Sequence, residues 1–196
     1  GGPFKPRCFW GIEEDIICAG NDEAISFLEK ILDEIINIFP SAYIHCGGDE
    51  CHRTRWKECP KCQQRMKDEG LENEDQLQSW FTQHFAKYLE NKGRRLIGWD
   101  EILRGDLDFP ESAVVMSWLG NADKAAKLGH DVVMSPNSYL YLDYPQFPAK
   151  DKYEYIAEGY GVYMTTYWIY HYNPTQGIDD ELTHHIIGCQ GNLWSE

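Results

Sequence analysis

The stretch Ala42-Tyr43-Ile44-His45-Cys46-Gly47-Gly48-Asp49-Glu50 decides the fold class of this chain. It opens with a short, mostly apolar run, continues through two glycines and ends in two adjacent acids. A short apolar run followed by a polar turn is typical of a strand in a parallel sheet, where both faces are buried. The glycines allow the backbone to bend as the strand ends, so the acids lie at its carboxyl end.

Runs of the same kind recur along the chain. They are Arg95–Gly98, Ala113–Ser117, Asp131–Met134 and Ile186–Cys189. Three helices are predicted around these strands. The first is capped by Asn21 and stopped by Pro40, and the second shows apolar residues at helical spacing from Leu77 to Leu89. The third is shorter and runs from about Asp123 to Leu128. Strands alternating with helices predict a parallel sheet joined by right-handed crossovers.

The residues that follow each predicted strand favour a (β/α)8 TIM barrel over a doubly wound sheet. Chemistry-capable side chains come after every strand: Asp49 and Glu50, Trp99 to Glu101, Trp118, Tyr141 and Asp143, Trp194 and Glu196. In such a barrel all carboxyl ends open on one face, which holds the active site. No phosphate-binding glycine pattern follows the first strand, which weakens the case for a dinucleotide-binding sheet.

Composition excludes several classes of partner. The 196 residues are 42% hydrophobic and carry a formal net charge of −14, so nucleic acid is an unfavourable partner. No apolar run is long enough to span a membrane. Seven tryptophans fit a surface that stacks on sugar rings, and they also fit an ordinary large core. We expect no cofactor.

Cysteine usage is ambiguous. Cys59-Pro-Lys-Cys62, with Cys51 and His52 upstream, has the spacing of half a zinc site, but a second such pair is absent. The alternatives are a local disulfide or plain thiols, and we expect no metal. A zinc-dependent hydrolase that uses these four residues is the corresponding functional alternative.

The Asp49–Glu50 pair is the sharpest chemical signal. Adjacent acids repel, so one carboxyl holds its proton at higher pH, as a general acid requires; a solvated acidic turn is the alternative. Retaining glycosidases with two protein carboxylates hold them ~5 Å apart across the sugar. Neighbouring residues can hardly flank the anomeric carbon in that way. If Glu50 is the acid, Asp49 orients the substrate, and a 2-acetamido carbonyl of the substrate can supply the nucleophile.

Residues His45–Glu50 resemble the H-x-G-G-D-E motif of glycoside hydrolase family 20, the β-N-acetylhexosaminidases. Gly98–Leu103, Met116–Trp118, Tyr141–Asp143 and Gly191–Glu196 resemble later motifs of that family, in the same order. The resemblance implies hydrolysis of terminal non-reducing β-linked N-acetylglucosamine or N-acetylgalactosamine by a retaining, substrate-assisted mechanism. Family 20 is one of the known exceptions to two-carboxylate catalysis.

The resemblance also implies a role for each matching residue. Glu50 is the expected acid/base, Asp49 holds the acetamido N–H, and Tyr141 donates to the acetamido oxygen. The remaining expectations concern sugar binding: Trp99, Trp118 and Trp194 wall the pocket, Asp143 assists at its edge, Glu196 binds outer hydroxyls, and His45 lies near the acid. Each role has an alternative. The tryptophans can pack in the core, Tyr141 and Asp143 can be turn residues, and His45 can be a core histidine. Asp100 and Glu101 receive no role.

The chain also departs from the family pattern. Only five strands can be counted, and they resemble the fourth to the eighth of the barrel, so residues 1–196 are expected to be a partial catalytic domain. Open edges at Tyr43 and Ile187 would then favour self-association. A non-catalytic carbohydrate-binding segment remains the alternative from another class. We expect an extracytoplasmic location, whether secreted, periplasmic or lysosomal.

Overall fold

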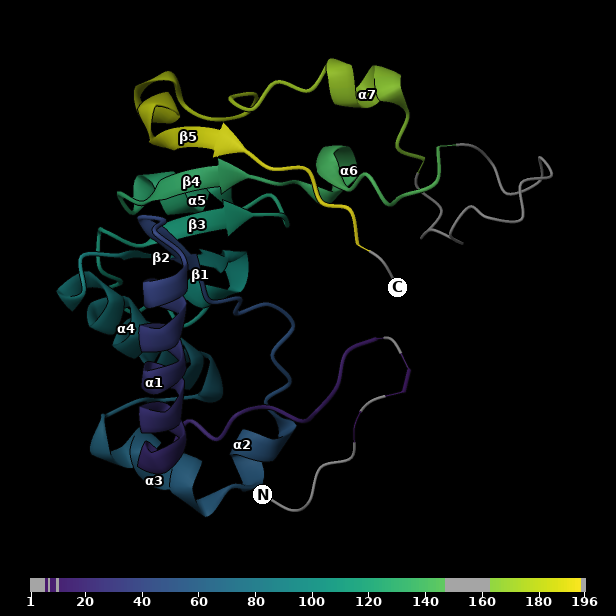
Figure 1. Cartoon of the computed structure of the whole chain (residues 1–196). Helices are drawn as coiled ribbons and strands as arrows, with labels where there is room; N and C mark the ends of the chain where they lie inside the picture. Colours follow the sequence, from purple (N-terminus) through teal and green to yellow (C-terminus); the bar gives the residue numbers. More distant parts are fainter. Residues whose placement is uncertain (1–5, 7, 10, 147–162, 195–196) are drawn as a thin grey trace. The chain divides into compact units, whose positions relative to one another are not determined.

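The computed structural model describes residues 6, 8, 9, 11–146 and 163–194, and within these the chain forms two compact units, residues 1–114 and 115–196. The first unit contains two strands, β1 (Tyr43–His45) and β2 (Arg95–Trp99). Its helices are α1 (Asp22–Ile38), α2 (Thr54–Glu58), α3 (Pro60–Asp68), α4 (Glu74–Asn91) and the 3₁₀ helix η1 (Asp100–Leu103). The long helix α4 packs against β2, α1 and α3 (Figure 1).

The second unit is built around β4 (Asp131–Met134) and β5 (Ile186–Cys189), which lie side by side and pair in parallel (Figure 1). The strand β3 (Val114–Ser117) begins at the boundary between the units and is buried at all four positions. The helices described in this unit are α5 (Ala122–Lys127), α6 (Asn137–Leu140), α7 (Thr166–Tyr170) and the 3₁₀ helix η2 (Asp180–His185). Helix α5 packs against β4 and η2.

The strands occur in the sheet in the order β1-β2-β3-β4-β5, and β1 pairs with β2 in parallel, with Tyr43 opposite Arg95. This order, with each strand beside the next in sequence, is that of part of a (β/α) barrel. All five predicted strands are confirmed within one residue at each end. The three predicted helices are confirmed as α1, α4 and α5, and Gly129 has the positive φ expected of a residue that follows a helix.

Two expectations about local structure are wrong. The outer strands are not buried on both faces: in β1 only Ile44 is buried, and β5 alternates between half-buried and exposed positions. Among the strands that the structure describes, these two are the first and last in the sheet order, so each has one strand neighbour there. Asn21 occupies the N-cap position of α1, but its side chain makes no capping hydrogen bond; its Oδ1 accepts instead from Lys61 Nζ at 3.4 Å.

Each unit has its own buried apolar side chains. Leu77, Leu89, Leu96 and Ile102 are fully buried in the first unit, and Val115, Val132 and Met164 in the second. The amphipathic helix α4 supplies the buried Leu77 and Leu89, as its helical periodicity predicts, and Leu77 packs with Trp56, Cys62 and Met66. Among the described helices, none has the length and apolar character needed to cross a membrane.

Candidate active site

The turn after β1 carries the two acids in an unusual backbone conformation. Gly47, Gly48 and Glu50 all have positive φ, at 72°, 100° and 49°. Glycine adopts such angles readily, whereas a glutamate there carries a conformational cost on the order of 1 kcal/mol. Gly48 also has no room for a side chain, because a Cβ there would lie 2.7 Å from Cγ2 of Ile102. The sequence Gly-Gly-Asp-Glu is therefore shaped to present its acids in one conformation.

Hydrogen bonds from other elements fix this turn. The backbone N–H of Trp99, at the end of β2, donates to Gly47 O at 2.9 Å. From α4, Gln78 Nε2 donates to Gly48 O at 2.6 Å, and Arg53 Nη2 donates to Gln78 Oε1 at 2.6 Å. Arg53 also pairs with Asp75 of α4 at 2.5 Å. Since Gln78 is buried, this network ties the turn rigidly to the helix.

Glu101 places a buried carboxylate beside the acids. Its side chain is 2% exposed, Oε1 accepts from the backbone N–H of Glu50 at 3.4 Å, and Arg104 lies 3.6 Å from the same oxygen. Desolvation is the larger cause that raises the pKa of Asp49, and the charge of Glu101 raises it further, while a hydrogen bond from the backbone of Asp49 opposes both. The side chain of Asp49 is exposed, so its carboxyl group is open to a hydrogen-bond donor.

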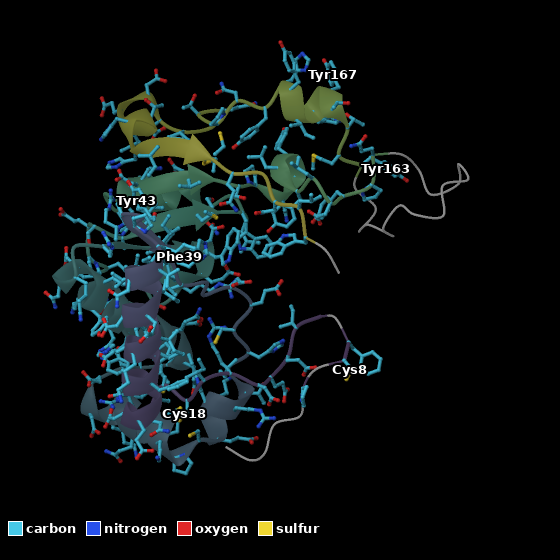
Figure 2. All side chains as sticks on the ribbon, in the orientation of Figure 1. Cys8, Cys18, Phe39, Tyr43, Tyr163 and Tyr167 are labelled. Carbon is cyan, nitrogen blue, oxygen red and sulfur yellow. The ribbon has the colours of Figure 1, made fainter. Side chains whose placement is uncertain are left out.

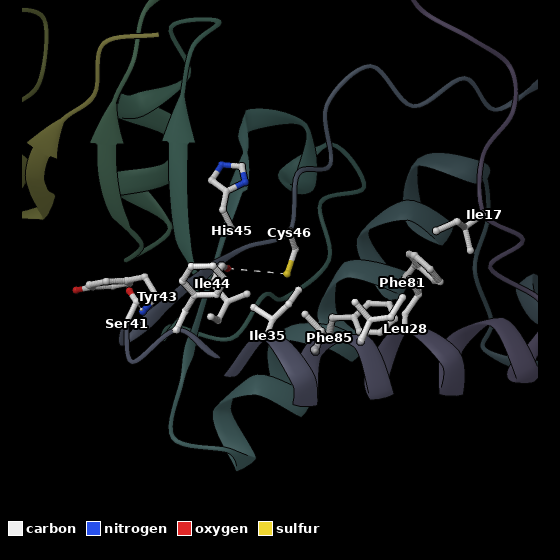
Figure 3. A pocket seen from close by; sticks show the side chains of 13 residues that line it. Ile17, Leu28, Ile35, Ser41, Tyr43, Ile44, His45, Cys46, Phe81 and Phe85 are labelled. Atoms are coloured by element: carbon white, nitrogen blue, oxygen red, sulfur yellow. Dashed lines mark hydrogen bonds between the residues drawn. The ribbon is translucent and has the colours of Figure 1, made fainter. Parts of the chain in front are cut away.

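His45 is not a core histidine, which corrects that alternative. Its side chain is exposed, and in Figure 3 it points away from the apolar side chains of Ile35 and Phe85. Nδ1 accepts from the Gly47 N–H at 3.0 Å, which leaves the proton of a neutral ring on Nε2. The ring meets Trp99 edge to face at 5.1 Å between centroids, and desolvation lowers the pKa of His45. The first unit thus brings together His45, Asp49, Glu50 and Trp99.

The second unit gathers the predicted aromatic residues of its own strands. Trp118, which follows β3, stacks on Tyr141 with 6.2 Å between ring centroids and 22° between ring planes. Tyr141 is not simply a turn residue: it is buried, it ends α6, and it forms a parallel bridge with Asn192. Asn192 is itself held by its side-chain amide, which donates to Ser135 Oγ at 3.0 Å. This aromatic group is therefore anchored to β4 and to the segment after β5.

Asp143 and Trp194 are the other predicted site residues that the structure describes in the second unit. Asp143 Oδ1 is buried without a hydrogen-bond partner among the described residues, and a buried acceptor of this kind is suited to a ligand donor. Trp194 is 49% exposed and Trp99 is 7% exposed, so Trp99 offers a ligand much less surface than Trp194 does. Glu196, expected to bind outer hydroxyls, lies outside the described residues.

The cysteines group differently from the zinc set that the spacing suggested. Cys59 and Cys62 lie together with Cys18, from the loop before α1, and not with His52. None of the seven cysteines, all within the described part of the chain, forms a disulfide. Sequence reasoning also missed Gln78 and Glu101 as residues that hold the acid turn. Glu101 comes directly after Trp99 and Asp100 at the end of a strand, and this position could have indicated that it lies near the acid turn.

A parallel sheet with its strands in sequential order, an acid-bearing turn and aromatic residues after the strands is the arrangement expected of part of a (β/α) barrel with a site at its strand ends. The chain belongs to glycosyl hydrolase family 20, whose catalytic domain matches residues 3–196. It is 45% identical over 197 residues to a β-hexosaminidase of Porphyromonas gingivalis, covering 98% of this chain and 25% of that protein.

Solved structures agree with this membership. A β-N-acetylhexosaminidase of Bacteroides fragilis is 32% identical with a TM-score of 0.76, over 93% of this chain and 37% of that one. A family 20 exo-β-N-acetylglucosaminidase of Vibrio harveyi, solved with N-acetylglucosamine, is 30% identical with a TM-score of 0.77, over 92% and 28%. The chain therefore spans between about a quarter and two-fifths of the length of these relatives.

Proposed function

We propose that this chain supplies the catalytic residues of a β-N-acetylhexosaminidase, which removes terminal non-reducing β-linked N-acetylglucosamine or N-acetylgalactosamine from glycans or chitooligosaccharides. One observation carries the proposal: Asp49 and Glu50 share a single turn that glycines, Gln78 and Glu101 hold in a left-handed conformation. Two acids so close together cannot act from opposite sides of a sugar ring, so the substrate's own acetamido group is the better nucleophile.

In the proposed mechanism Glu50 donates its proton to the glycosidic oxygen as the bond to the anomeric carbon breaks. The acetamido oxygen attacks that carbon from the other face, and a cyclic oxazolinium intermediate forms. Asp49 accepts a hydrogen bond from the acetamido N–H and stabilises the positive charge that develops there. Glu50, now ionised, takes a proton from water, which opens the ring with overall retention of configuration.

The aromatic and polar residues of the second unit receive the binding roles. We assign the Tyr141 hydroxyl to the acetamido oxygen and the rings of Trp99, Trp118 and Trp194 to the apolar walls around the sugar. The stacking of Trp118 on Tyr141 supports this, because it holds both rings in fixed orientations. The Oδ1 of Asp143, which has no hydrogen-bond partner within the described part of the chain, is assigned to a sugar donor group, and Glu196 to outer hydroxyls.

The first unit has an exposed apolar surface that we propose is a contact surface for polypeptide. An apolar groove of about 460 Å³ runs along α1 and the start of β1, lined by Ile31, Ile35, Phe39, Tyr43 and neighbouring side chains (Figure 3). Phe39 is 57% exposed. Exposed apolar surface of this kind favours association. We propose that further polypeptide covers it, and that the 196-residue chain alone self-associates. The extracytoplasmic location remains a prediction.

Hydrolysis of a chromogenic β-N-acetylglucosaminide by the protein at its full encoded length tests the activity. Proton NMR of the reaction in its first minutes identifies the anomer released, and the β anomer is expected. A binding module would retain the sugar without releasing the chromophore, and release of the α anomer would contradict the retaining mechanism.

A further inference from the structure

Three cysteines meet in the first unit: Cys18 from the loop before α1, and Cys59 and Cys62 from the start of α3; none of them has a role assigned above. The sulfur of Cys18 lies 3.6 Å from that of Cys59 and 3.6 Å from that of Cys62, and all three sulfurs lie within 4.8 Å of one another. Disulfide sulfurs are about 2.05 Å apart. Sulfurs around a tetrahedral Zn²⁺ ion, each about 2.3 Å from the metal, are about 3.8 Å apart. The observed 3.6 Å is far too long for a disulfide; it fits thiols in contact and is also close to the spacing of sulfurs around one metal ion.

The backbone of α3 sets the relative position of two of the cysteines. Cys59 is the N-cap of α3, and Pro60 follows at the first helical position. Cys62 comes three residues after Cys59, and residues three apart lie on the same face of a helical turn. The first turn of α3 therefore presents both sulfurs on one side.

The surroundings of Gly20 show that the loop before α1 lies tightly against the start of α3. A Cβ added at Gly20 would lie 2.2 Å from the carbonyl carbon and oxygen of Lys61 and 2.5 Å from the backbone nitrogen of Cys62. No side chain can be accommodated against rigid backbone at that distance. The loop before α1 is therefore in backbone contact with the start of α3, and this contact brings Cys18 to the Cys59–Cys62 pair.

The surroundings exclude water from one side of the cluster. Cys62 is fully buried, and Ala19, Trp56, Met66 and Leu77 form one apolar cluster with it. Trp56 Nε1 donates to Ile17 O at 2.9 Å, which fixes the loop that carries Cys18. Soft thiolate ligands select zinc over calcium or magnesium. Cys51 packs against the same apolar cluster but does not belong to the group of sulfurs within 4.8 Å of one another, so a water molecule would fill the fourth position.

We propose that Cys18, Cys59 and Cys62 bind one Zn²⁺ ion as a structural site that joins the loop before α1 to the start of α3. The site takes no part in the proposed hydrolysis. It stabilises the segment that follows the acid turn, because α2 and α3 lie between that turn and α4. This ligand set differs from the one that the sequence spacing suggested, since Cys18 enters it and His52 does not.

The protein at its full encoded length, purified under reducing conditions and incubated with Zn²⁺, tests the site by metal analysis. We expect one tightly held zinc per chain, and Co²⁺ in its place should give thiolate-to-cobalt charge-transfer bands and the visible bands of a tetrahedral ion. Alkylation mapped by mass spectrometry should find Cys18, Cys59 and Cys62 protected until a chelator is added. Cys8 and Cys189 are exposed and should react throughout; Figure 2 shows Cys8 well apart from Cys18.

Cys62→Ser should weaken Zn²⁺ binding more than about 100-fold, because loss of an outer-shell partner alone costs 10–100-fold. Cys189→Ser is the matched control and should bind as tightly as the unmodified protein. Unchanged zinc affinity in Cys62→Ser, cobalt spectra without thiolate bands, or a disulfide from Cys18 to either partner would overturn the proposal. If Cys62→Ser does not fold, the alkylation pattern of the unmodified protein decides: equal reactivity with and without Zn²⁺ contradicts the site.

Discussion

The backbone N–H of Glu50 donates a hydrogen bond to the buried carboxylate of Glu101, at 3.4 Å from its Oε1. Glu101 therefore acts on both acids of the turn: it helps to hold the left-handed backbone of Glu50, and its charge raises the pKa of Asp49. A carboxylate acceptor makes stronger hydrogen bonds than a neutral one. The position of the expected general acid thus depends on a residue fifty-one positions further along the chain.

Glu101→Gln should move the acidic limb of the pH–activity profile to lower pH. In the proposed mechanism Asp49 acts as a carboxylate, so activity should fall when the pH drops below its pKa, which desolvation and the charge of Glu101 raise. Glutamine keeps an oxygen for the Glu50 N–H but removes the charge, so the pKa of Asp49 falls. The profile of kcat/KM against pH measures this. Exposed Glu111→Gln is the control, and an acidic limb that stays in place would contradict the coupling.

Glu50→Gln should lose about 10²–10⁴-fold in turnover of an unactivated disaccharide, because the amide keeps the shape of the side chain but cannot donate a proton. Substrate binding should remain. A substrate with a good leaving group should recover part of the lost rate, since its departure needs little protonation. Steady-state kinetics on the two substrates measure the difference, and near-full turnover of the disaccharide would remove Glu50 from the acid role.

Gly98→Ala should destabilise the chain by about 1–3 kcal/mol, as overpacking of a filled core does. A Cβ at Gly98 would lie 2.7 Å from Cγ2 of the fully buried Ile102 and 3.2 Å from the backbone oxygen of Gly47, so the acid turn must move as well. Gly188→Ala, with no atom within 4 Å of its added Cβ, is the matched control. Urea unfolding compares them, and equal stabilities would show that this packing is not restrictive.

The 196-residue chain expressed alone should self-associate and show weak or no activity. Size-exclusion chromatography with light scattering gives the mass, and Phe39→Ser should lower the associated fraction because Phe39 lines the apolar groove. Phe27→Ser removes a side chain that is 63% exposed but outside that groove, and should leave association unchanged. A stable, fully active monomer would contradict the proposal for this face.

The sequence predicted the strands well because each is a short apolar run bounded by turn residues. It also predicted α1, α4 and α5, because these helices show an extended apolar pattern at helical spacing or end at a clear stop residue. It did not predict α2 and α3, since Pro60 divides a short polar segment into two helices with little apolar pattern. The acids and aromatic residues were recognised from ordered motifs. Gln78, Glu101 and Cys18 were not, because their importance lies in contacts with residues 30 to 51 positions away.

Substrate assistance is the central claim, and the most direct measurement compares two substrates that differ only at the 2-position. The full-length protein should hydrolyse an aryl β-N-acetylglucosaminide and should not turn over the corresponding β-glucoside, even at saturation. A thiazoline made from N-acetylglucosamine, which resembles the cyclised intermediate, should inhibit competitively and more tightly than substrate binds. Comparable kcat values on the two glycosides, without inhibition by the thiazoline, would contradict the account.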